Sequence, residues 1–218
     1  MYEDITITLL DKMGTDDTVV NAARVSFAKE ASGYSAEQNA KLIGYLATHN
    51  HWSPFAHCTL QFHVKAPMFV ARQLAKHQVG FAWNEVSRRY VDTEVKFWSP
   101  GGAWRARADN KKQGSSEDIV QKFPLVQELY NDVVEIALRA YKAMLEDGVC
   151  PEQARAVLPQ GLMTEWYWTG SLYGFARVCK LRMDPHAQLE CRIVAQQIDA
   201  LCKDAFPISW SALNGQVV

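Results

Sequence analysis

The sequence predicts a single α+β domain in which an antiparallel sheet is flanked by helices and the second half is mainly helical. Two segments with apolar alternation in the first part predict strands, whereas helical periodicity dominates from about residue 121 onward. A length of 218 residues, with 48% hydrophobic and 22% charged side chains, is typical of a globular protein with a sizeable core. We therefore expect one domain over residues 1–218.

The two expected strands lie at residues 5–14 (ITITLLDKMG) and 57–67 (HCTLQFHVKAP). In the first, β-branched residues alternate ahead of a glycine turn, which is typical of a strand. In the second, Leu60, Phe62 and Val64 alternate with polar residues, so one face is expected to be buried and the other exposed.

Helices are expected near the strands at residues 17–24, 35–50 and 68–78. Ser35 and Gln38 have capping-box spacing, which predicts where the second of these helices begins. A proline directly before the third helix suits its first turn. The order of strand, helix, strand and then mostly helices favours an antiparallel sheet over a doubly wound parallel one.

The second half is expected to contain helices at about 121–148, 151–159, 164–182 and 185–206. The segment 91–120 precedes them, has weak periodicity and is rich in glycine, serine and cations. This composition predicts a long mobile loop. Loops of this length in compact domains are usually functional or disordered.

Bulk charge and cysteine content exclude several classes of protein. With 23 basic and 24 acidic residues the net charge is −1, so no general attraction to nucleic acid or membranes is expected. The five cysteines are odd in number and lack C-x-x-C spacing, which argues against a disulfide framework or a zinc site. No apolar run is long enough to span a bilayer, and the N-terminus lacks a secretory pattern. We expect a cytoplasmic protein with mostly buried free thiols.

Residues 76–90 (KHQVGFAWNEVSRRY) contain a high density of hydrogen-bond donors. A solvated turn would account for the charges, but it leaves the aromatic rings of Phe81, Trp83 and Tyr90 unexplained. Cationic and amide donors suit a phosphate or carboxylate, and interleaved aromatic rings suit a planar ring system. The segment therefore favours a site for a nucleotide or a flavin, although an RNA-binding loop would use the same residue types.

Four blocks of the sequence, in order, resemble the flavin-dependent thymidylate synthases (the ThyX family). They are AARVSF at 22–27, PFAHCTLQFHVKAPMFVARQLAKHQVGFAWNEVSRRY at 54–90, ARAVLP at 154–159 and LRMDPHAQLE at 181–190. In the family, a basic-His-Arg triplet is followed seven residues on by a serine, in a segment that ends Arg-Tyr. The blocks occur in the family's order and are spread over residues 22–190, so the resemblance is specific.

The resemblance implies conversion of dUMP to dTMP. Methylenetetrahydrofolate would donate the one-carbon unit, and FAD reduced by NADPH would donate a hydride. It also implies a homotetramer in which each site is built from more than one subunit. In such an enzyme the cofactor carries the chemistry, and the protein supplies orientation and charge.

The resemblance also implies roles for individual residues. Arg182 would be catalytic, because it matches the position that favours the ionised N3 of the uracil ring, a sound role for a fixed guanidinium. His51 resembles a histidine close to the folate and flavin rings. With Arg182, the implied contacts to dUMP are Gln73, Lys76, Glu85, Ser87, Arg88, Arg89 and Arg155. The implied contacts to FAD are Ser53, Lys76, His77, Gln78, Glu85, Ser171, Tyr173 and Arg177.

Some of these residues also have structural interpretations. Arg182 could pair with Asp184 in a loop, and His51 could be a solvated loop residue. Ser87 is expected to bind substrate through its hydroxyl rather than to act as a nucleophile, because hydride transfer to the ring removes the need for an adduct with the enzyme.

The chain departs from the family pattern at three points. Lys76 and Gln78 stand where arginine is usual, which removes a bidentate fork and a charge. Eight residues, not seven, separate Gln78 from Ser87, so we expect a one-residue bulge within VGFAW. Arg177 replaces a typical asparagine and could supply the cation that Gln78 lacks.

Two other functions stay open on the sequence alone. One is a noncatalytic nucleotide- or RNA-binding protein that uses the basic loop RARADNKK at 105–112. The other is a sibling enzyme that modifies uridylate with a different one-carbon donor. Bound flavin would distinguish the first from the synthase, and the identity of the product would distinguish the second.

Overall fold

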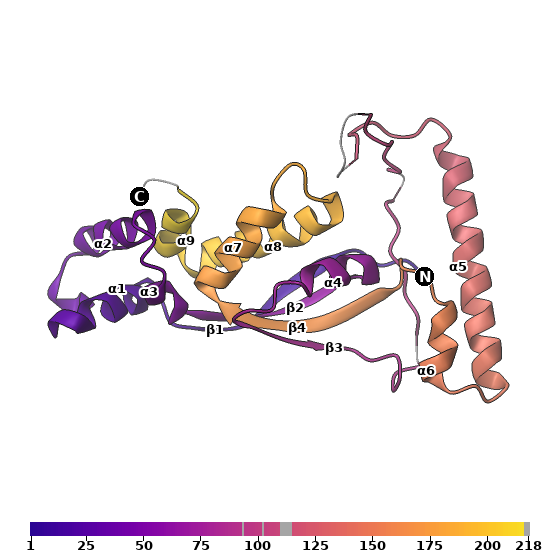
Figure 1. Cartoon of the computed structure of the whole chain (residues 1–218), viewed down its shortest axis with the longest axis horizontal. Helices are drawn as coiled ribbons and strands as arrows, with labels where there is room; N and C mark the ends of the chain where they lie inside the picture. Colours follow the sequence, from indigo (N-terminus) through magenta and orange to yellow (C-terminus); the bar gives the residue numbers. More distant parts are fainter. Residues whose placement is uncertain (93, 102, 110–114, 216–218) are drawn as a thin grey trace.

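The computed structural model describes residues 1–92, 94–101, 103–109 and 115–215. Its centre is a four-stranded antiparallel sheet with strand order β1-β2-β4-β3 (Figure 1). The strands are β1 (Thr6–Met13), β2 (Thr59–Pro67), β3 (Phe81–Glu85) and β4 (Met163–Ser171). The fold class is thus α+β with an antiparallel sheet, as the sequence predicts.

Helices cover one face of the sheet and extend beyond both of its ends. Figure 1 shows α4, α7 and α8 over the sheet, α1, α2, α3 and α9 at one end, and α5 and α6 at the other. Their bounds are α1 (Asp16–Arg24), α2 (Ala36–Thr48), α3 (Ser53–Ala56), α4 (Met68–Leu74), α5 (Phe123–Glu146), α6 (Pro151–Ala154), α7 (Leu172–Arg182), α8 (Leu189–Ala205) and α9 (Pro207–Leu213).

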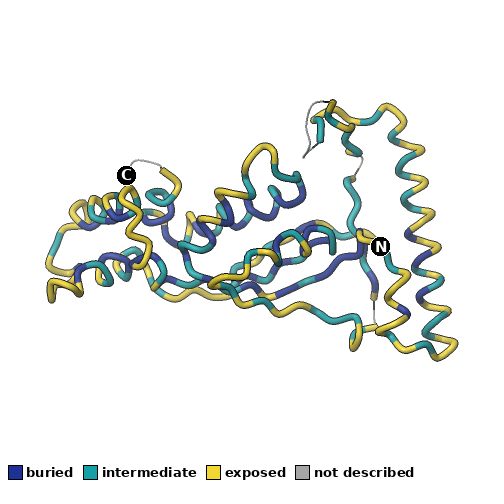
Figure 2. The backbone as a smooth tube through the Cα atoms, viewed as in Figure 1, coloured by how far each residue is buried: buried dark blue, intermediate teal, exposed yellow. Residues whose placement is uncertain are grey.

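The main core lies between the sheet and α4, α7 and α8 (Figure 2). The pattern predicted for the second strand is confirmed, because Leu60, Phe62 and Val64 are fully buried on β2. Trp166 and Trp168 of β4 lie on the same side of the sheet and are also buried. A second, smaller cluster holds α5 and α6 against the end of the sheet.

The helix predicted at 164–182 is wrong in its first half, where the chain forms β4. The segment alternates between buried Trp166 and Trp168 and more exposed neighbours, which is the period of a strand. Its many aromatic residues suit a strand that is paired on both sides, with β2 and with β3. The helix α7 begins only at Leu172, after Ser171 caps it by accepting a hydrogen bond from the Gly174 N–H (3.1 Å).

The segment 76–90 also contains a strand that the sequence analysis missed. Gly80 turns the chain with a φ of +80°, and β3 then pairs with β4 in regular register from Phe81 to Glu85. Phe81 and Trp83 pack against the core. This pairing shows no register shift, so the one-residue bulge expected within VGFAW does not lie in its strand part, Phe81–Trp83; Val79 and Gly80 precede the strand.

Several predicted boundaries are confirmed. Ser35 caps α2, and Gln38 completes the capping box. The helix expected at 121–148 is α5, and Gly148 follows its end with a φ of +84°. The described parts of 91–120 contain no helix or strand, only isolated bridges and turns, whereas residues 93, 102 and 110–114 lie outside the described residues.

All five cysteines are free; four are buried, and Cys150 is exposed. Within the described ranges, no helix is both long and apolar enough to cross a membrane. The same ranges contain no cluster of three or more His, Cys, Asp or Glu side chains that could hold a metal ion.

Candidate active site

Arg182, at the last turn of α7, lies against the end of α4. Its Nε donates to Nε2 of His77 (3.0 Å), and its Nη2 donates to the main-chain carbonyl of Gln73 (3.3 Å). The alternative partner fails, because Asp184 accepts instead from the N–H and the ring of His186. Two fixed acceptors therefore orient the guanidinium, as an electrostatic role requires.

The protonation of His77 follows from this contact. Partial burial, and next the positive charges of Arg182 and Arg177, hold the pKa of His77 below its usual 6.5. The imidazole is therefore neutral at pH 7 and can accept the hydrogen bond from Arg182 on Nε2. A neutral histidine carries no charge of its own, and no carboxylate in the described part of the chain pairs with Arg182, so the positive charge of the arginine is available to an anionic ligand.

Gln73 belongs to a chain of polar contacts that leads away from Arg182. Its side chain donates to Gln188, and its Oε1 accepts from the thiol of Cys191 (3.2 Å). Gln188 donates to Glu190 (2.8 Å), whose carboxylate is buried and pairs with Arg105 of the long loop (2.7 Å). These contacts fix the side chain of Gln73 beside α8.

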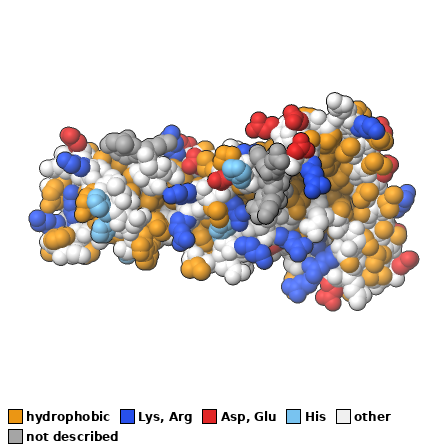
Figure 3. All heavy atoms as spheres, turned by 45° about the horizontal axis from the view of Figure 1, so that its top comes forward, with side chains coloured by type: hydrophobic (Ala, Val, Ile, Leu, Met, Phe, Trp, Pro, Cys, Tyr) orange, Lys and Arg blue, Asp and Glu red, His pale blue; other side chains and the backbone are white. Residues whose placement is uncertain are grey.

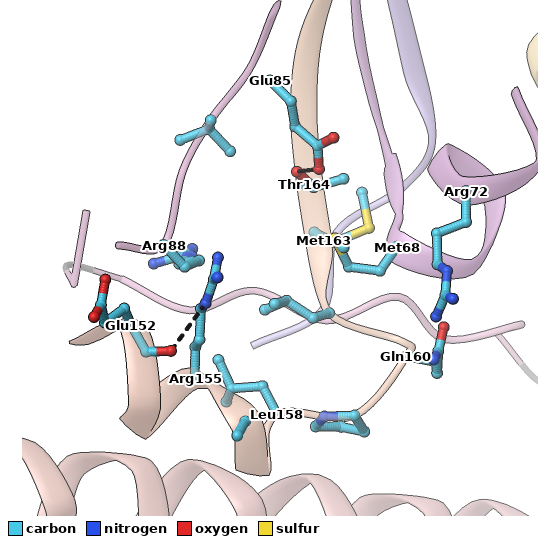
Figure 4. A pocket seen from close by; sticks show the side chains of 14 residues that line it. Met68, Arg72, Glu85, Arg88, Glu152, Arg155, Leu158, Gln160, Met163 and Thr164 are labelled. Atoms are coloured by element: carbon cyan, nitrogen blue, oxygen red, sulfur yellow. Dashed lines mark hydrogen bonds between the residues drawn. The ribbon is translucent and has the colours of Figure 1, made fainter. Parts of the chain in front are cut away.

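A second group of predicted residues surrounds a cavity of about 520 Å³ at the end of the sheet (Figure 4). Glu85 enters it from β3 and accepts a hydrogen bond from Thr164 of β4 (2.7 Å). Arg88 and Arg155 lie side by side on the opposite wall. Arg155 donates to the carbonyl of Glu152 (3.2 Å), and Arg88 to the carbonyl of Glu94 (2.9 Å).

Ser87 and Arg89 follow the end of β3, beside this cavity. The hydroxyl of Ser87 accepts from Nε of Arg89 (3.2 Å) and from its main-chain N–H (3.4 Å). Arg89 also lies over the ring of Tyr90 (5.0 Å). Within the described chain, no histidine or lysine is hydrogen-bonded to Ser87, so it lacks the base that would activate a nucleophile.

Arg72 connects these two groups. It lines the 520 Å³ cavity, and it also lines a smaller one of about 460 Å³ together with Gln73, Lys76 and Arg182. Both cavities therefore meet at the exposed side of α4. Lys76 is exposed there, in the turn that follows the end of α4.

The remaining predicted residues lie elsewhere. His51 and Ser53 line a third cavity, between α1, α2 and α3 at the other end of the sheet. Tyr173 faces Trp52 near that end (ring centroids 6.1 Å apart). Gln78 and Arg177 are exposed, with Arg177 close enough to His77 to influence its charge. In a single copy of the chain, the predicted residues therefore lie in separate places, from one end of the sheet to the other.

Several residues of these cavities are not among those predicted from the sequence. Arg72 is one of them, although it stands only four residues before Lys76. Thr164 lies in the strand that was misread as a helix, so its contact with Glu85 had no detectable signal. The pair of Arg105 and Glu190 joins residues far apart in the chain and depends on tertiary structure alone.

Taken together, the cavities contain arginines with fixed geometry, one of which is held by a neutral histidine, and aromatic surfaces. Arginines of this kind bind phosphate and developing negative charge on a planar ring. The class of protein is therefore an enzyme that acts on a nucleotide rather than a general nucleic-acid binder.

Comparisons with known proteins identify the family within this class. A family model described as "Thymidylate synthase complementing protein" matches residues 8–208. A flavin-dependent thymidylate synthase of Thermus thermophilus is 40% identical, covering 95% of this chain and 75% of that protein. One from Thermosipho africanus is 36% identical, covering 94% and 89%. The chain belongs to the flavin-dependent thymidylate synthase family.

The fold has a close counterpart among solved structures. The UMP/dUMP methylase PolB from Streptomyces cacaoi, bound with 5-Br dUMP, superposes with a TM-score of 0.88. The match covers 99% of this chain and 97% of that one, at 29% sequence identity.

Proposed function

We propose that this protein converts dUMP to dTMP, with methylenetetrahydrofolate as one-carbon donor and NADPH-reduced FAD as hydride donor. The observation that carries the proposal is Arg182, which is held by a neutral His77 and by the Gln73 carbonyl and forms no ion pair with a carboxylate of the described residues. A fixed cation at this point would stabilise the anionic form of the uracil ring, the form in which C5 is nucleophilic.

The phosphate of dUMP is proposed to bind near Arg88, Arg89 and Arg155. Arg88 and Arg155 stand together on one wall of the 520 Å³ cavity. Two guanidinium groups in this arrangement suit a phosphate dianion. Glu85 is held by Thr164, so its carboxylate has a fixed position from which it can accept a hydrogen bond from the nucleotide.

The residues around His77 fit a flavin dinucleotide. Such a group needs cations for its pyrophosphate and aromatic surfaces for its rings. Lys76 and Arg177 are exposed cations near His77. Tyr173, at the start of the helix that carries Arg177, and Trp52 would offer aromatic surface farther along, towards the other end of the sheet. When bound, FAD supplies the hydride chemistry that amino-acid side chains lack.

Arg177 is proposed to compensate for the uncharged Gln78. Replacing Arg177 with alanine is expected to weaken FAD binding about tenfold while leaving dUMP binding unchanged, because one charge-assisted contact is lost. Titration of the apoprotein with FAD, followed by flavin absorbance, measures the effect. Lys180→Ala is the matched control, since Lys180 is an exposed cation on the same helix. Equal losses in both variants would contradict the proposal.

Ser87 is proposed to bind substrate without forming a covalent bond to it. Ser87→Ala is expected to lower kcat/KM about tenfold and to leave measurable dTMP formation. The substitution removes one hydrogen bond to the substrate, but it does not remove a nucleophile. Steady-state assays of the purified variant measure this. Complete loss of turnover in a folded variant would show that Ser87 is essential to the chemistry.

A homotetramer with shared sites is also proposed. The predicted residues are separated along the chain, so a single copy does not close one site around them. In addition, α5 exposes an apolar face made of Leu125, Leu129, Val133 and Ile136. Figure 3 shows hydrophobic side chains gathered over this end of the molecule. Contact between copies would remove such a face from water.

The first experiment is the visible absorption spectrum of the purified protein, before and after addition of FAD and then of dUMP. We expect a retained flavin spectrum that dUMP perturbs, because the two ligands would share one site. Absence of flavin binding would favour the noncatalytic binding protein instead, and an RNA-binding assay would follow.

A second candidate is methylation of UMP as well as dUMP. The superposition on the UMP/dUMP methylase PolB favours it. Parallel assays with UMP and dUMP, with the products identified by mass spectrometry, distinguish the two candidates. Turnover of dUMP alone is the result expected for a thymidylate synthase.

A further inference from the structure

A buried carboxylate stands at the far end of the polar contacts that lead away from Gln73. Glu190 lies in the first turn of α8, and its side chain is only 7% exposed. Its Oε1 accepts from Nη2 of Arg105 (2.7 Å), and its Oε2 accepts from Nε2 of Gln188 (2.8 Å). An ionised carboxylate has acceptors only, so both neighbours must present N–H groups to it.

This requirement is passed on to Gln73, which lies in the last turn of α4 beside α8 (Figure 1). Because Gln188 turns its NH2 group toward Glu190, its carbonyl oxygen is left to face α4. There it accepts a hydrogen bond from Nε2 of Gln73. The nitrogen of the Gln73 amide therefore faces Gln188, and the orientation of this amide is determined by a carboxylate two contacts away.

The thiol of Cys191 favours the same orientation from the other side. Burial raises the pKa of this thiol to about 11, so it is protonated at pH 7. It donates to Oε1 of Gln73 (3.2 Å). A thiol is a weak donor, whereas a hydrogen bond to a carboxylate is strengthened by the charge, so Glu190 has the larger influence on the amide.

Gln73 borders the same cavity as Arg182. Both line the cavity of about 460 Å³, and Nη2 of Arg182 donates to the main-chain carbonyl of Gln73 (3.3 Å). An amide group has two N–H donors and two lone pairs on its oxygen. The contacts with Gln188 and Cys191 use one donor and one lone pair. One donor and one acceptor of Gln73 are left, at fixed positions, for a base that lies next to Arg182.

A fixed donor beside a fixed acceptor can distinguish uracil from cytosine. Uracil has a carbonyl oxygen at C4 and an N–H at N3, whereas cytosine has an amino group at C4 and a bare nitrogen at N3. The donors and acceptors along this edge are therefore reversed between the two bases. A site with oriented polar groups rejects a ligand that leaves those groups unpaired.

We propose that Glu190 is a positioning residue that orients the amide of Gln73 and thereby makes the site select a uracil base over a cytosine base. This role rests on the proposed function in one respect, since Gln73 is taken to contact the base of the nucleotide. Glu190 acts only through Gln188 and Gln73 and does not touch the substrate. Arg105 holds the carboxylate in place.

The affinities for dUMP and dCMP measure this selection. Isothermal titration of the purified wild-type protein is expected to give a Kd for dUMP that is lower than the Kd for dCMP by about a hundredfold or more. A wild-type protein without this preference would overturn the proposal.

Glu190→Gln removes the requirement for a donor at this point, because the new amide can either donate or accept. The orientation of Gln73 is then no longer imposed, and we expect the ratio of the two Kd values to fall by about tenfold or more. A general loosening of the structure would weaken both nucleotides alike and leave the ratio unchanged, so the ratio reports orientation and not stability.

Gln188→Leu tests the same step without breaking the buried ion pair. It interrupts the contact between Glu190 and Gln73, so we expect a similar fall in the ratio, and it decides the question if Glu190→Gln does not fold. Gln196→Leu is the matched control, because Gln196 is an exposed glutamine of α8, and it should leave both affinities unchanged. A wild-type ratio in either folded variant of the relay, Glu190→Gln or Gln188→Leu, would overturn the proposal.

Steady-state kinetics separate this role from the proposed function. Arg182 is held by His77 and by the main chain of Gln73, and neither contact involves the Gln73 side chain. Gln188→Leu is therefore expected to raise KM for dUMP about tenfold and to leave kcat within about twofold of wild type. Formation of dTMP with an unchanged ratio would refute the role of Glu190 alone. Selective binding of dUMP without any dTMP formation would refute the synthase and leave the positioning role standing.

Discussion

Replacement of Arg182 by alanine is expected to lower kcat for dTMP formation by about 10²–10³-fold. The guanidinium is oriented by His77 and by the carbonyl of Gln73, so it can stabilise charge on the uracil ring without reorganisation. Removal of one preorganised donor of this kind typically has an effect of this size. The measurement is kcat and KM of the FAD-loaded variant.

The controls separate charge from geometry. Arg182→Lys keeps the charge but loses the planar fork, so we expect it to recover only part of kcat. Lys180→Ala removes a cation two residues earlier on α7 and is expected to leave kcat unchanged. An Arg182→Ala variant with wild-type kcat and a raised KM would assign Arg182 to binding alone.

Replacement of Phe175 by alanine is expected to lower the free energy of unfolding by about 3–5 kcal/mol, the usual cost of removing a buried phenylalanine. Phe175 lies on α7, is fully buried and meets three other rings. Their centroids lie 4.9 Å (Phe62), 5.0 Å (Phe81) and 5.3 Å (Trp168) from its own. Urea denaturation, followed by tryptophan fluorescence and by circular dichroism, measures the change.

Leu181→Ala on the same helix is the matched control, because Leu181 is 57% exposed. We expect its free energy of unfolding to stay within about 0.5 kcal/mol of wild type. A loss of less than 1 kcal/mol in Phe175→Ala would mean that the aromatic cluster between the sheet and α7 contributes little to stability. The packing described for the core would then need revision.

Local signals in the sequence were sufficient for much of the fold. Ser35 and Gln38 marked the start of α2, and Gly148 marked the end of α5. The alternation of Leu60 and Phe62 identified β2 and its buried face. These signals work because caps, turns and alternation depend on residues close together in the chain.

The strands β3 and β4 were missed because their pattern has meaning only within the sheet. β4 is a central strand whose aromatic residues can also be read as a helix face. Phe81 of β3 packs where Gly170 of β4 leaves room, since a Cβ there would lie 2.4 Å from its ring. No local window of sequence contains that complementarity.

The sequence by itself determined the α+β class, several helix boundaries and, through four ordered blocks, the family. Only the tertiary structure decided which predicted residues meet. In the structure, Arg182 is hydrogen-bonded to His77 rather than to Asp184, and Glu85 is hydrogen-bonded to Thr164. The structure also buries Arg24 without an ion pair to any carboxylate of the described residues. The physical reason is that hydrogen bonds and desolvation depend on distances between atoms far apart in the chain, and spacing along the sequence does not encode these distances.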